Sequence, residues 1–503
     1  MKDIQPIIPI STEIKPIIPF IKSNRINTVQ TTFLNKFKSH SPNRINRNRL
    51  IVLITALGVV GTINCESINA APSIYPTGTT RYDPNKAFNS YVLFTSGDNI
   101  AHLIDMNGNS VHEWKDAASH STLIDPSVNG GKLGHVFVTL DTVEGKGTGL
   151  IPGQVNRKVA KTVAELDWDG KVVWSFGEKA PGGVAQQHHD WARLPNGNTV
   201  ILANLVHPVK GFKQPKVLDD VVYEVNPVGE VVWKWIASEH LNEFGFTPNE
   251  LKLVRNADIA DYLHVNNLKV VGANHWFASG DKRFNPDNLL FDARNANFIA
   301  IIDKKTGKIA WRLGPHYSDV SEEQQYSRKV PRPVDQISAQ HDAHIIPEGL
   351  PGAGNLLVFD NQGVAGYPPA SVPRTGGSRV LEIDPVKKEI VWQYTGEDSG
   401  GPTWSFRSTH ISAARRLPNG NTFVDEGQSG RLFQVTREGE IVWEYVNPYL
   451  RKGKDPFTGR ATANNQLYRG QPVPYGWVPT GTPHTEKAVI PPELSRFQLP
   501  PAP

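Results

Sequence analysis

The sequence predicts an all-β protein, a six-bladed β-propeller with four-stranded blades. A hairpin that ends in tryptophan, as in DGKVVW and EGEIVW, recurs about every 66 residues. The composition, with 43 Gly and 39 Pro among 503 residues, suits a globular chain rich in turns. A fixed period of this length indicates a repeat architecture. The six repeats end at Trp114, Trp174, Trp233, Trp311, Trp392 and Trp443.

Each repeat contains two hairpins, which supply the four strands of a blade. Before the tryptophan, segments such as TVAELDWDG alternate apolar and polar residues and then turn. A second hairpin follows several tryptophans, as in residues 193–203 and 416–426, where Asn-Gly tolerates a positive φ. Six blades fall within the range known for propellers. We expect the tryptophans to pack between blades, and residues 84–115 and 430–446 to close the ring by sharing a blade.

Three regions follow from this pattern. Residues 1–71 form a basic N-terminal region with a signal peptide or anchor, and residues 72–448 form the propeller. Residues 449–503 are rich in Pro and Gly, and we expect an extended tail on the propeller surface. Residues 239–262 are predicted to be a helical insertion.

The N-terminal region has the layout of a secretory signal. The apolar run 51–63 follows Arg44, Arg47 and Arg49 and precedes small residues, which places cleavage near Ala70 or Ala71. About 13 residues are short for a spanning helix, so an uncleaved anchor is the less favoured alternative and the only predicted membrane contact. The expected location is the periplasm or the exterior.

Charge and cysteine content exclude several functions. The net charge of +4 comes from the N-terminal region, and the remainder carries about −2, which argues against a nucleic-acid partner. The single cysteine, Cys65, lies in the segment expected to be removed. A cysteine nucleophile, a cysteine-ligated zinc site and an iron–sulfur cluster are therefore excluded from the mature protein.

Histidines recur at one phase of the repeat. His189 and His341 each stand six residues before the proline of a matching turn, and His264 and Asn266 hold the corresponding place in the blade between them. His410 lies at a slightly shifted phase in a later blade. Equivalent positions of inner strands converge in the channel, so we expect these residues to form a site.

A metal site is the first chemical alternative for clustered histidines. No HExxH or similar close-spaced motif is present. Arg294, in FDARNANF, would add a fixed cation near the same channel, which favours an oxyanion over a divalent metal. We therefore predict neither a metal nor a cofactor.

The segments HHDWARLPNGNTVILA, LHVNN with ARN, and QHDAH with NLLVFDN resemble those of the bacterial arylsulfate sulfotransferases, from about residue 91 to 448. The resemblance implies transfer of a sulfuryl group from an aryl sulfate donor to a phenolic acceptor, without 3′-phosphoadenosine 5′-phosphosulfate (PAPS). The sequence agrees, because it contains no GxxxxGK[ST] phosphate loop.

The same resemblance implies residue roles. His341 would carry the sulfuryl group as sulfohistidine, and the developing charge would be stabilised by donors from the other site residues. His189, paired with Asp190, would act as base, while His188 and His344 are expected to be secondary or structural. The predicted catalytic residues are His341, His189, His264 and Arg294, and the predicted substrate-binding residues are Asn266 and His410.

Two other functions fit a propeller of this kind. ELDWDGKVVWSF and IIDKKTGKIAWRLG resemble the docking repeats of pyrroloquinoline quinone dehydrogenases, but there are six repeats rather than eight and no Cys-Cys pair. A non-catalytic binding scaffold is the third possibility, because propellers host many functions.

Overall fold

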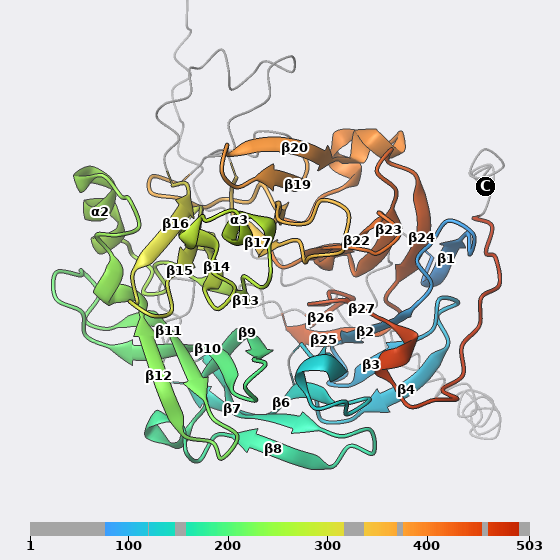
Figure 1. The fold of residues 1–503 in the computed structure, drawn as a ribbon, viewed down its shortest axis with the longest axis horizontal. Helices are drawn as coiled ribbons and strands as arrows, with labels where there is room; N and C mark the ends of the chain where they lie inside the picture. The colour runs from blue at the N-terminus through green and yellow to red at the C-terminus, as the bar shows by residue number, and fades with distance from the viewer. Residues whose placement is uncertain are drawn as a thin grey trace, which may run out of the picture. The chain divides into compact units, whose positions relative to one another are not determined.

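The computed structural model describes residues 76–118, 120–145, 157–315, 337–369, 376–454 and 461–491. In these residues, six antiparallel sheets, five with four strands and one with a fifth strand added, form a ring (Figure 1), which confirms the six-bladed propeller. The predicted signal peptide or anchor and Cys65 lie outside the described residues. Among the helices described, none is long and apolar enough to cross a membrane.

We name the blades A to F and give each from its innermost to its outermost strand. Blade A contains β27 (Gln471–Val473), β2 (Tyr91–Thr95), β3 (Ala101–Ile104) and β4 (Ser110–Trp114). Blade B contains β5 (Thr122–Leu123), β6 (Val136–Gly145), β7 (Arg157–Leu166) and β8 (Val172–Phe176). Blade C contains β9 (Gln187–Arg193), β10 (Thr199–His207), β11 (Val217–Val225) and β12 (Val231–Ile236).

The other three blades follow the chain in the same order. Blade D contains β13 (Val265–Val270), β14 (Leu289–Ala293), β15 (Phe298–Ile302) and β16 (Ile309–Leu313). Blade E contains β17 (His341–Ile345), β18 (Leu356–Asp360), β19 (Arg379–Asp384) and β20 (Glu389–Tyr394). Blade F contains β21 (Ala413–Arg416), β22 (Thr422–Glu426), β23 (Arg431–Val435) and β24 (Ile441–Val446).

Two segments outside the repeats close the ring. Strand β1 (Gly78–Tyr82) pairs with β24 as a fifth strand of blade F, and β27 pairs with β2 as the inner strand of blade A. The prediction that residues 84–115 and 430–446 share one blade is therefore wrong. The expected surface tail instead returns to the channel and completes blade A.

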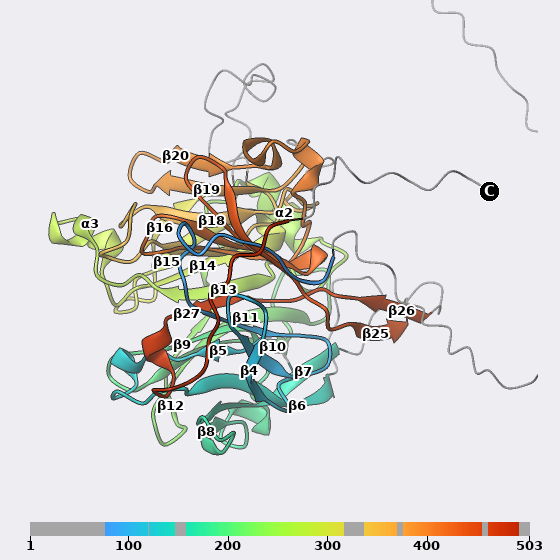
Figure 2. The same ribbon diagram turned by 90° about the vertical axis from the view of Figure 1, so that its right-hand side faces the viewer.

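The remaining elements are short. Strands β25 (Arg451–Lys454) and β26 (Ala461–Asn464) form a hairpin that projects to one side in Figure 2. The insertion predicted to be helical over residues 239–262 contains one α-helix, α2 (Pro248–Arg255), started by a capping box of Thr247 and Glu250. A one-turn helix, α3 (His275–Ala278), lies between β13 and β14.

The hydrophobic core is divided into six clusters, each between two neighbouring blades. Tryptophans on outermost strands also join blades through hydrogen bonds. The indole Nε1 of Trp443 donates to Met106 O (2.7 Å), which joins blade F to blade A. Trp311 donates in the same way to Pro385 O (2.8 Å), so these tryptophans pack between blades as predicted.

Five of the six repeat tryptophans occupy the same register position. Trp174, Trp233, Trp311, Trp392 and Trp443 each face the third-strand residue that precedes a register shift. In blade A this position belongs to His112, and Trp114 lies two residues later. The predicted equivalence thus fails for Trp114, although its Nε1 still bonds the next blade at Asp167 O (3.0 Å).

Replacing Trp443 with alanine should lower the free energy of unfolding by about 3–5 kcal/mol, because it leaves a cavity at the closure of the ring. The measurement is equilibrium unfolding in guanidinium chloride. Trp404→Ala is the matched control, since Trp404 is 70% exposed and its loss should have little effect. Equal destabilisation by both variants would contradict this account of the inter-blade core.

Candidate functional site

The inner strands of four blades are entered through the same backbone turn. Gln186, His264, Ala339 and Ile411 each have a left-handed backbone, with φ of 48°, 50°, 55° and 54°. A non-glycine residue rarely adopts this conformation, and it persists only where surrounding contacts hold it. The repeated turn brings the residues beside it to one end of the channel.

His189 and His264 form a hydrogen-bonded pair at this end. Their Nε2 atoms are 3.2 Å apart, and Nδ1 of His264 lies 2.7 Å from Oδ2 of Asp261. Because the carboxylate accepts a hydrogen bond from Nδ1–H, a neutral His264 presents a lone pair at Nε2, and His189 donates to it. The structure brings these two predicted residues together and adds Asp261, which the sequence analysis did not identify.

His341 is oriented by two acceptors on one nitrogen. Its Nδ1 lies 2.7 Å from Oδ1 of Asn361 and 3.0 Å from the carbonyl oxygen of Ala339. The amide of Asn361 is itself oriented, because its Nδ2 donates to Ser408 O (2.6 Å) and Ile411 O (2.8 Å). Two acceptors require a proton on Nδ1, so Nε2 of His341 carries the lone pair.

The surroundings of His341 also disfavour its protonation. Burial lowers the pKa of His341 well below its usual value, and the positive charge of Arg294 lowers it further. His264 acts in the same direction, whereas the hydrogen bond to Asn361 opposes the shift. His341 is therefore a neutral imidazole at neutral pH.

Arg294 belongs to the same site. It opens a 3₁₀ turn, Arg294–Ala296, directly after β14, and its backbone N–H donates to His264 O (3.2 Å). Its guanidinium Nη1 donates to Oδ1 of Asn295 (2.7 Å). Burial and the charge of Arg294 lower the pKa of His410, so the cation influences His410 as well as His341.

Asn266 and Tyr468 form the wall behind the histidines. Asn266 is fully buried, and its Nδ2 donates to Gln340 O (3.1 Å), directly before His341. The hydroxyl of Tyr468 donates to the backbone oxygen of Asn266 (3.0 Å). The Tyr468 ring meets those of His189 and His341 edge-on, with centroids 5.5 and 6.2 Å away. Tyr468 comes from the C-terminal segment, in which no motif was identified.

A buried ionic layer lies directly beneath the histidines. Nη1 of Arg469 lies 3.0 Å from Oδ2 of Asp190 and 3.0 Å from Oδ1 of Asp342. These two aspartates directly follow His189 and His341 in the chain. Asp190 also pairs with Lys269 at 2.8 Å. The carboxylate expected to serve His189 is thus used by Lys269 and Arg469, while the histidine pair has a carboxylate contact through Asp261.

The two secondary histidines lie on opposite sides of this layer. The ring of His188 packs 4.0 Å from that of His189, whereas His344 contacts Arg415 beyond the layer. One nitrogen from each of His188, His189 and His264 lies within 4.8 Å of the others, a spacing that a metal ion can bridge. The absence of a metal in the functional protein remains a prediction, tested below.

Nuclear magnetic resonance of ¹⁵N-histidine protein should show that His341 stays neutral as the pH falls through 6.5. The shift is due mainly to burial, so in Arg294→Met the pKa of His341 should rise but stay below the usual value. The assignment is made with His341→Gln. Protonation of His341 near pH 6.5 in the unaltered protein would show that its pKa is not lowered and would contradict the prediction.

Known proteins place these features in a family. The model of the family described as Arylsulfotransferase (ASST) matches residues 82–469, which include every predicted site residue. A search of curated proteins gave no significant match. Solved structures with similar topology include a protein of unknown function from Bacteroides caccae (13% identity, 77% of this chain and 99% of that chain, TM-score 0.41). A streptogramin B lyase (13%, 78% and 92%, 0.37) is also similar.

The family match extends over most of the propeller, from β1 to the Tyr468–Arg469 segment of the channel. It favours a sulfotransferase over a quinoprotein dehydrogenase or a binding scaffold, and it implies small aryl sulfates and phenols as substrates. The chain therefore belongs to the arylsulfotransferase family.

Proposed function

We propose that this sulfotransferase moves a sulfuryl group from an aryl sulfate to a phenol in two steps, through a covalent intermediate on His341 and without PAPS. The observation that carries the proposal is the orientation of His341. Its Nδ1 faces two acceptors, so Nε2 holds the lone pair that a nucleophile requires. Burial keeps the imidazole unprotonated.

In the first step, Nε2 of His341 attacks the sulfur of the donor. An N–S bond forms, the bond between sulfur and the aryl oxygen breaks, and the phenolate leaves with the bonding electrons. The His189–His264 pair, in its protonated form, gives the leaving oxygen a proton. Asp261 favours that protonated form because its carboxylate accepts from Nδ1 of His264 (2.7 Å).

The second step reverses these events with a new phenol. The acceptor oxygen attacks sulfur, the N–S bond breaks, and His341 recovers its lone pair. The histidine pair takes the proton of the acceptor, which restores the protonation state that the first step consumed. No proton or electron is gained or lost over the cycle, so the two steps need no redox cofactor and no external proton donor.

Arg294 supplies the fixed positive charge for both steps. The sulfuryl oxygens and the aryl oxygen gain negative charge in the transition state, and a buried guanidinium stabilises such charge strongly. Arg294 is largely buried, and its charge acts on His341. His410, which is also influenced by Arg294, is the proposed contact for the substrate body.

Asn361 and Asn266 act as positioning residues in this proposal. Asn361 holds the ring of His341 through Nδ1, and Asn266 holds the backbone before it through Gln340 O. In this proposal Asn266 orients the strand that carries the nucleophile, and its role in substrate binding stays a prediction.

We also propose that the protein is exported. Nine Lys or Arg residues precede the apolar run 51–63, and small residues surround the expected cleavage point. This arrangement supports a location in the periplasm or outside the cell.

Incubation of the purified protein with p-nitrophenyl sulfate and phenol, without PAPS, should release nitrophenol and form phenyl sulfate. Release should begin before acceptor binds, and EDTA should not reduce the rate, because we propose no metal at the histidines. His341→Ala should abolish transfer, and Arg294→Ala should reduce it about 10²–10³-fold, because one stabilising donor is lost. His275→Ala, at an exposed histidine, is the matched control.

The covalent step has its own readout in the same experiment. Acceptor-free protein quenched at mildly basic pH should yield a peptide with a sulfuryl group on His341 by mass spectrometry. A label on another residue would contradict the proposed nucleophile. A rate that requires donor and acceptor to be bound together would contradict the two-step route.

Expression of the full chain in a bacterial host should yield exported protein whose N-terminus lies near Pro72. The physical reason is cleavage after the short apolar run, close to Ala70 or Ala71. N-terminal sequencing and detection of peptides from the purified protein provide the measurement. Recovery of a peptide containing Cys65 from the mature protein would exclude cleavage at this point.

A further inference from the structure

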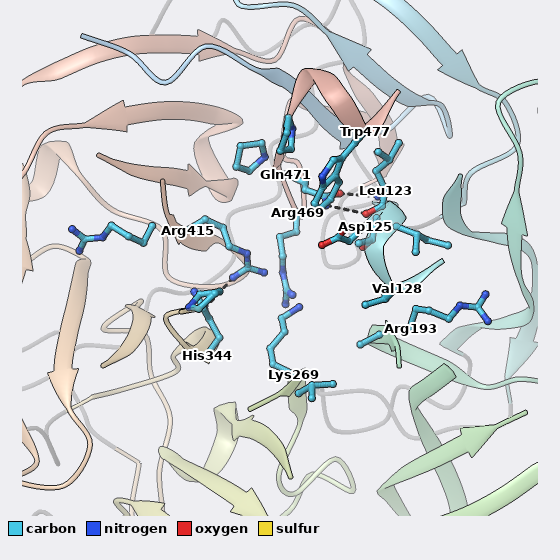
Figure 3. A pocket seen from close by; sticks show the side chains of 18 of the residues that line it. Leu123, Asp125, Val128, Arg193, Lys269, His344, Arg415, Arg469, Gln471 and Trp477 are labelled. Atoms are coloured by element: carbon cyan, nitrogen blue, oxygen red, sulfur yellow. Dashed lines mark hydrogen bonds between the residues drawn. The ribbon is translucent and has the colours of Figure 1, made fainter. Parts of the chain in front are cut away.

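A cavity opens at the end of the channel away from the histidine pair. It has a volume of about 670 Å³ and is lined by the ends of inner strands β9, β13, β17 and β21 and by residues of β27 (Figure 3). On β17, His344 lies three residues beyond His341, and Arg193 lies four residues beyond His189 on β9. A strand rises about 3.3 Å per residue, so roughly 10 Å separates the two ends.

The inner end of this cavity is formed by three cations. Lys269, Arg415 and Arg469 point toward its centre in Figure 3. The side chains of Lys269 and Arg415 remain 22% and 24% exposed, so both can be reached from the cavity although they form ion pairs. Arg469 is buried and separates the cavity from the histidine pair above.

Among the residues that the structure describes, two ionised carboxylates form ion pairs with these three cations at the inner end of the cavity. Asp190 pairs with Lys269 and Arg469, and Asp342 pairs with Arg415 and Arg469. Burial alone would raise the pKa of both carboxyls, but Lys269 beside Asp190 and Arg415 beside Asp342 hold each below its usual value. Both are therefore ionised at neutral pH.

The other titratable groups nearby add no further negative charge at the inner end. Burial raises the pKa of Asp292 and Asp425 well above the usual value, so both are protonated. Burial lowers the pKa of His344 to about 3, so it is neutral, and that of Lys269 to about 8, so it is mainly charged at pH 7. One positive charge is thus left unbalanced.

The walls and the rim of the cavity carry paired charges and apolar side chains. On the walls, Arg193 and Arg416 are paired with Glu165 and Glu382, and at the rim Glu348 is exposed and Asp125 is half-buried. Apolar side chains cover much of the remaining lining: Phe88, Val270, Ile345, Leu350, Leu417 and Trp477. A cavity of this size, with apolar walls and a cluster of charged groups at its inner end, is suited to a small molecule that has an apolar body and a charged group.

We propose that this cavity binds a monoanionic organic molecule, with its carboxylate, sulfate or sulfonate group at Lys269, Arg415 and Arg469 and its apolar body against the walls. A single unbalanced charge favours a monoanion over a polyanion such as a nucleotide. This site is separate from the histidine site, and the inference does not depend on the proposed transfer reaction.

The test is isothermal titration calorimetry with naphthalene-2-sulfonate, whose sulfur is bonded to carbon and cannot be transferred. We expect saturable binding, similar binding of naphthalene-2-carboxylate, and at least ten-fold weaker binding of neutral naphthalene-2-methanol and of inorganic sulfate. Binding of the sulfonate alone would exclude carboxylates from the proposed class. Absence of binding by both anions would overturn the proposal.

Variants locate the site. Lys269→Met should weaken sulfonate binding at least ten-fold, with folding checked by circular dichroism. Leu350→Glu leaves the ionic layer intact, adds negative charge to the wall and should also weaken binding at least ten-fold. Its matched control is Val228→Glu, on an exposed turn away from the cavity, which should bind normally.

Two further variants distinguish this site from the histidine site. His341→Ala should bind naphthalene-2-sulfonate normally even if it loses transfer activity, so failure of the transfer proposal would leave this result intact. Binding that survives Leu350→Glu but is lost in Arg294→Ala would place the anion among the histidines and overturn the inference.

Discussion

The guanidinium of Arg469 is the contact on which the centre of the molecule depends. It pairs at 3.0 Å with Asp190 of blade C and Asp342 of blade E, and it comes from the segment that enters blade A as β27. Removing one partner of such a buried pair typically costs about 3–5 kcal/mol, because a charge is left without compensation. Arg469 therefore both links the segment that closes the ring to blades C and E and supplies a positive charge in the channel.

The same contact sets the position of the histidines that we propose to be catalytic. Asp190 and Asp342 directly follow His189 and His341, so fixing the carboxylates fixes the backbone at each histidine. Asn361 and Asp261 then select which ring nitrogen carries the proton in His341 and His264. The ion pairs of Arg469 thus hold the backbone positions of His189 and His341. The acceptors Asn361 and Asp261 determine which nitrogen of His341 and His264 is protonated.

The sequence was sufficient for the architecture because blades repeat and a repeated tryptophan is visible without any structure. The ring closure was not predictable from it, since β27 is three residues long, contains Pro472 and has no alternating pattern. Trp114 was assigned two residues out of phase because a tryptophan was counted where the register places His112.

The site, too, could be predicted from the sequence only where its residues belong to a repeat. The equivalent positions of His189 and His341 in two matching segments predicted the histidine cluster. Asn361 lies within the F-D-N segment that supported the resemblance. Tyr468 and Arg469 follow no repeat and reach the channel only through tertiary pairing, so no local pattern could place them. Asp190 was assigned to its sequence neighbour, whereas buried cations from other blades compete for it more strongly.

The two ends of the channel share one electrostatic source. The excess positive charge of the ionic layer lies close enough to His341 for Arg469 to lower the pKa of the imidazole, together with burial and Arg294. That charge helps to keep Nε2 unprotonated, as a nucleophile requires. An anion held at Lys269 and Arg469 would oppose this effect, so occupancy of the lower cavity and the protonation of His341 are linked through Arg469.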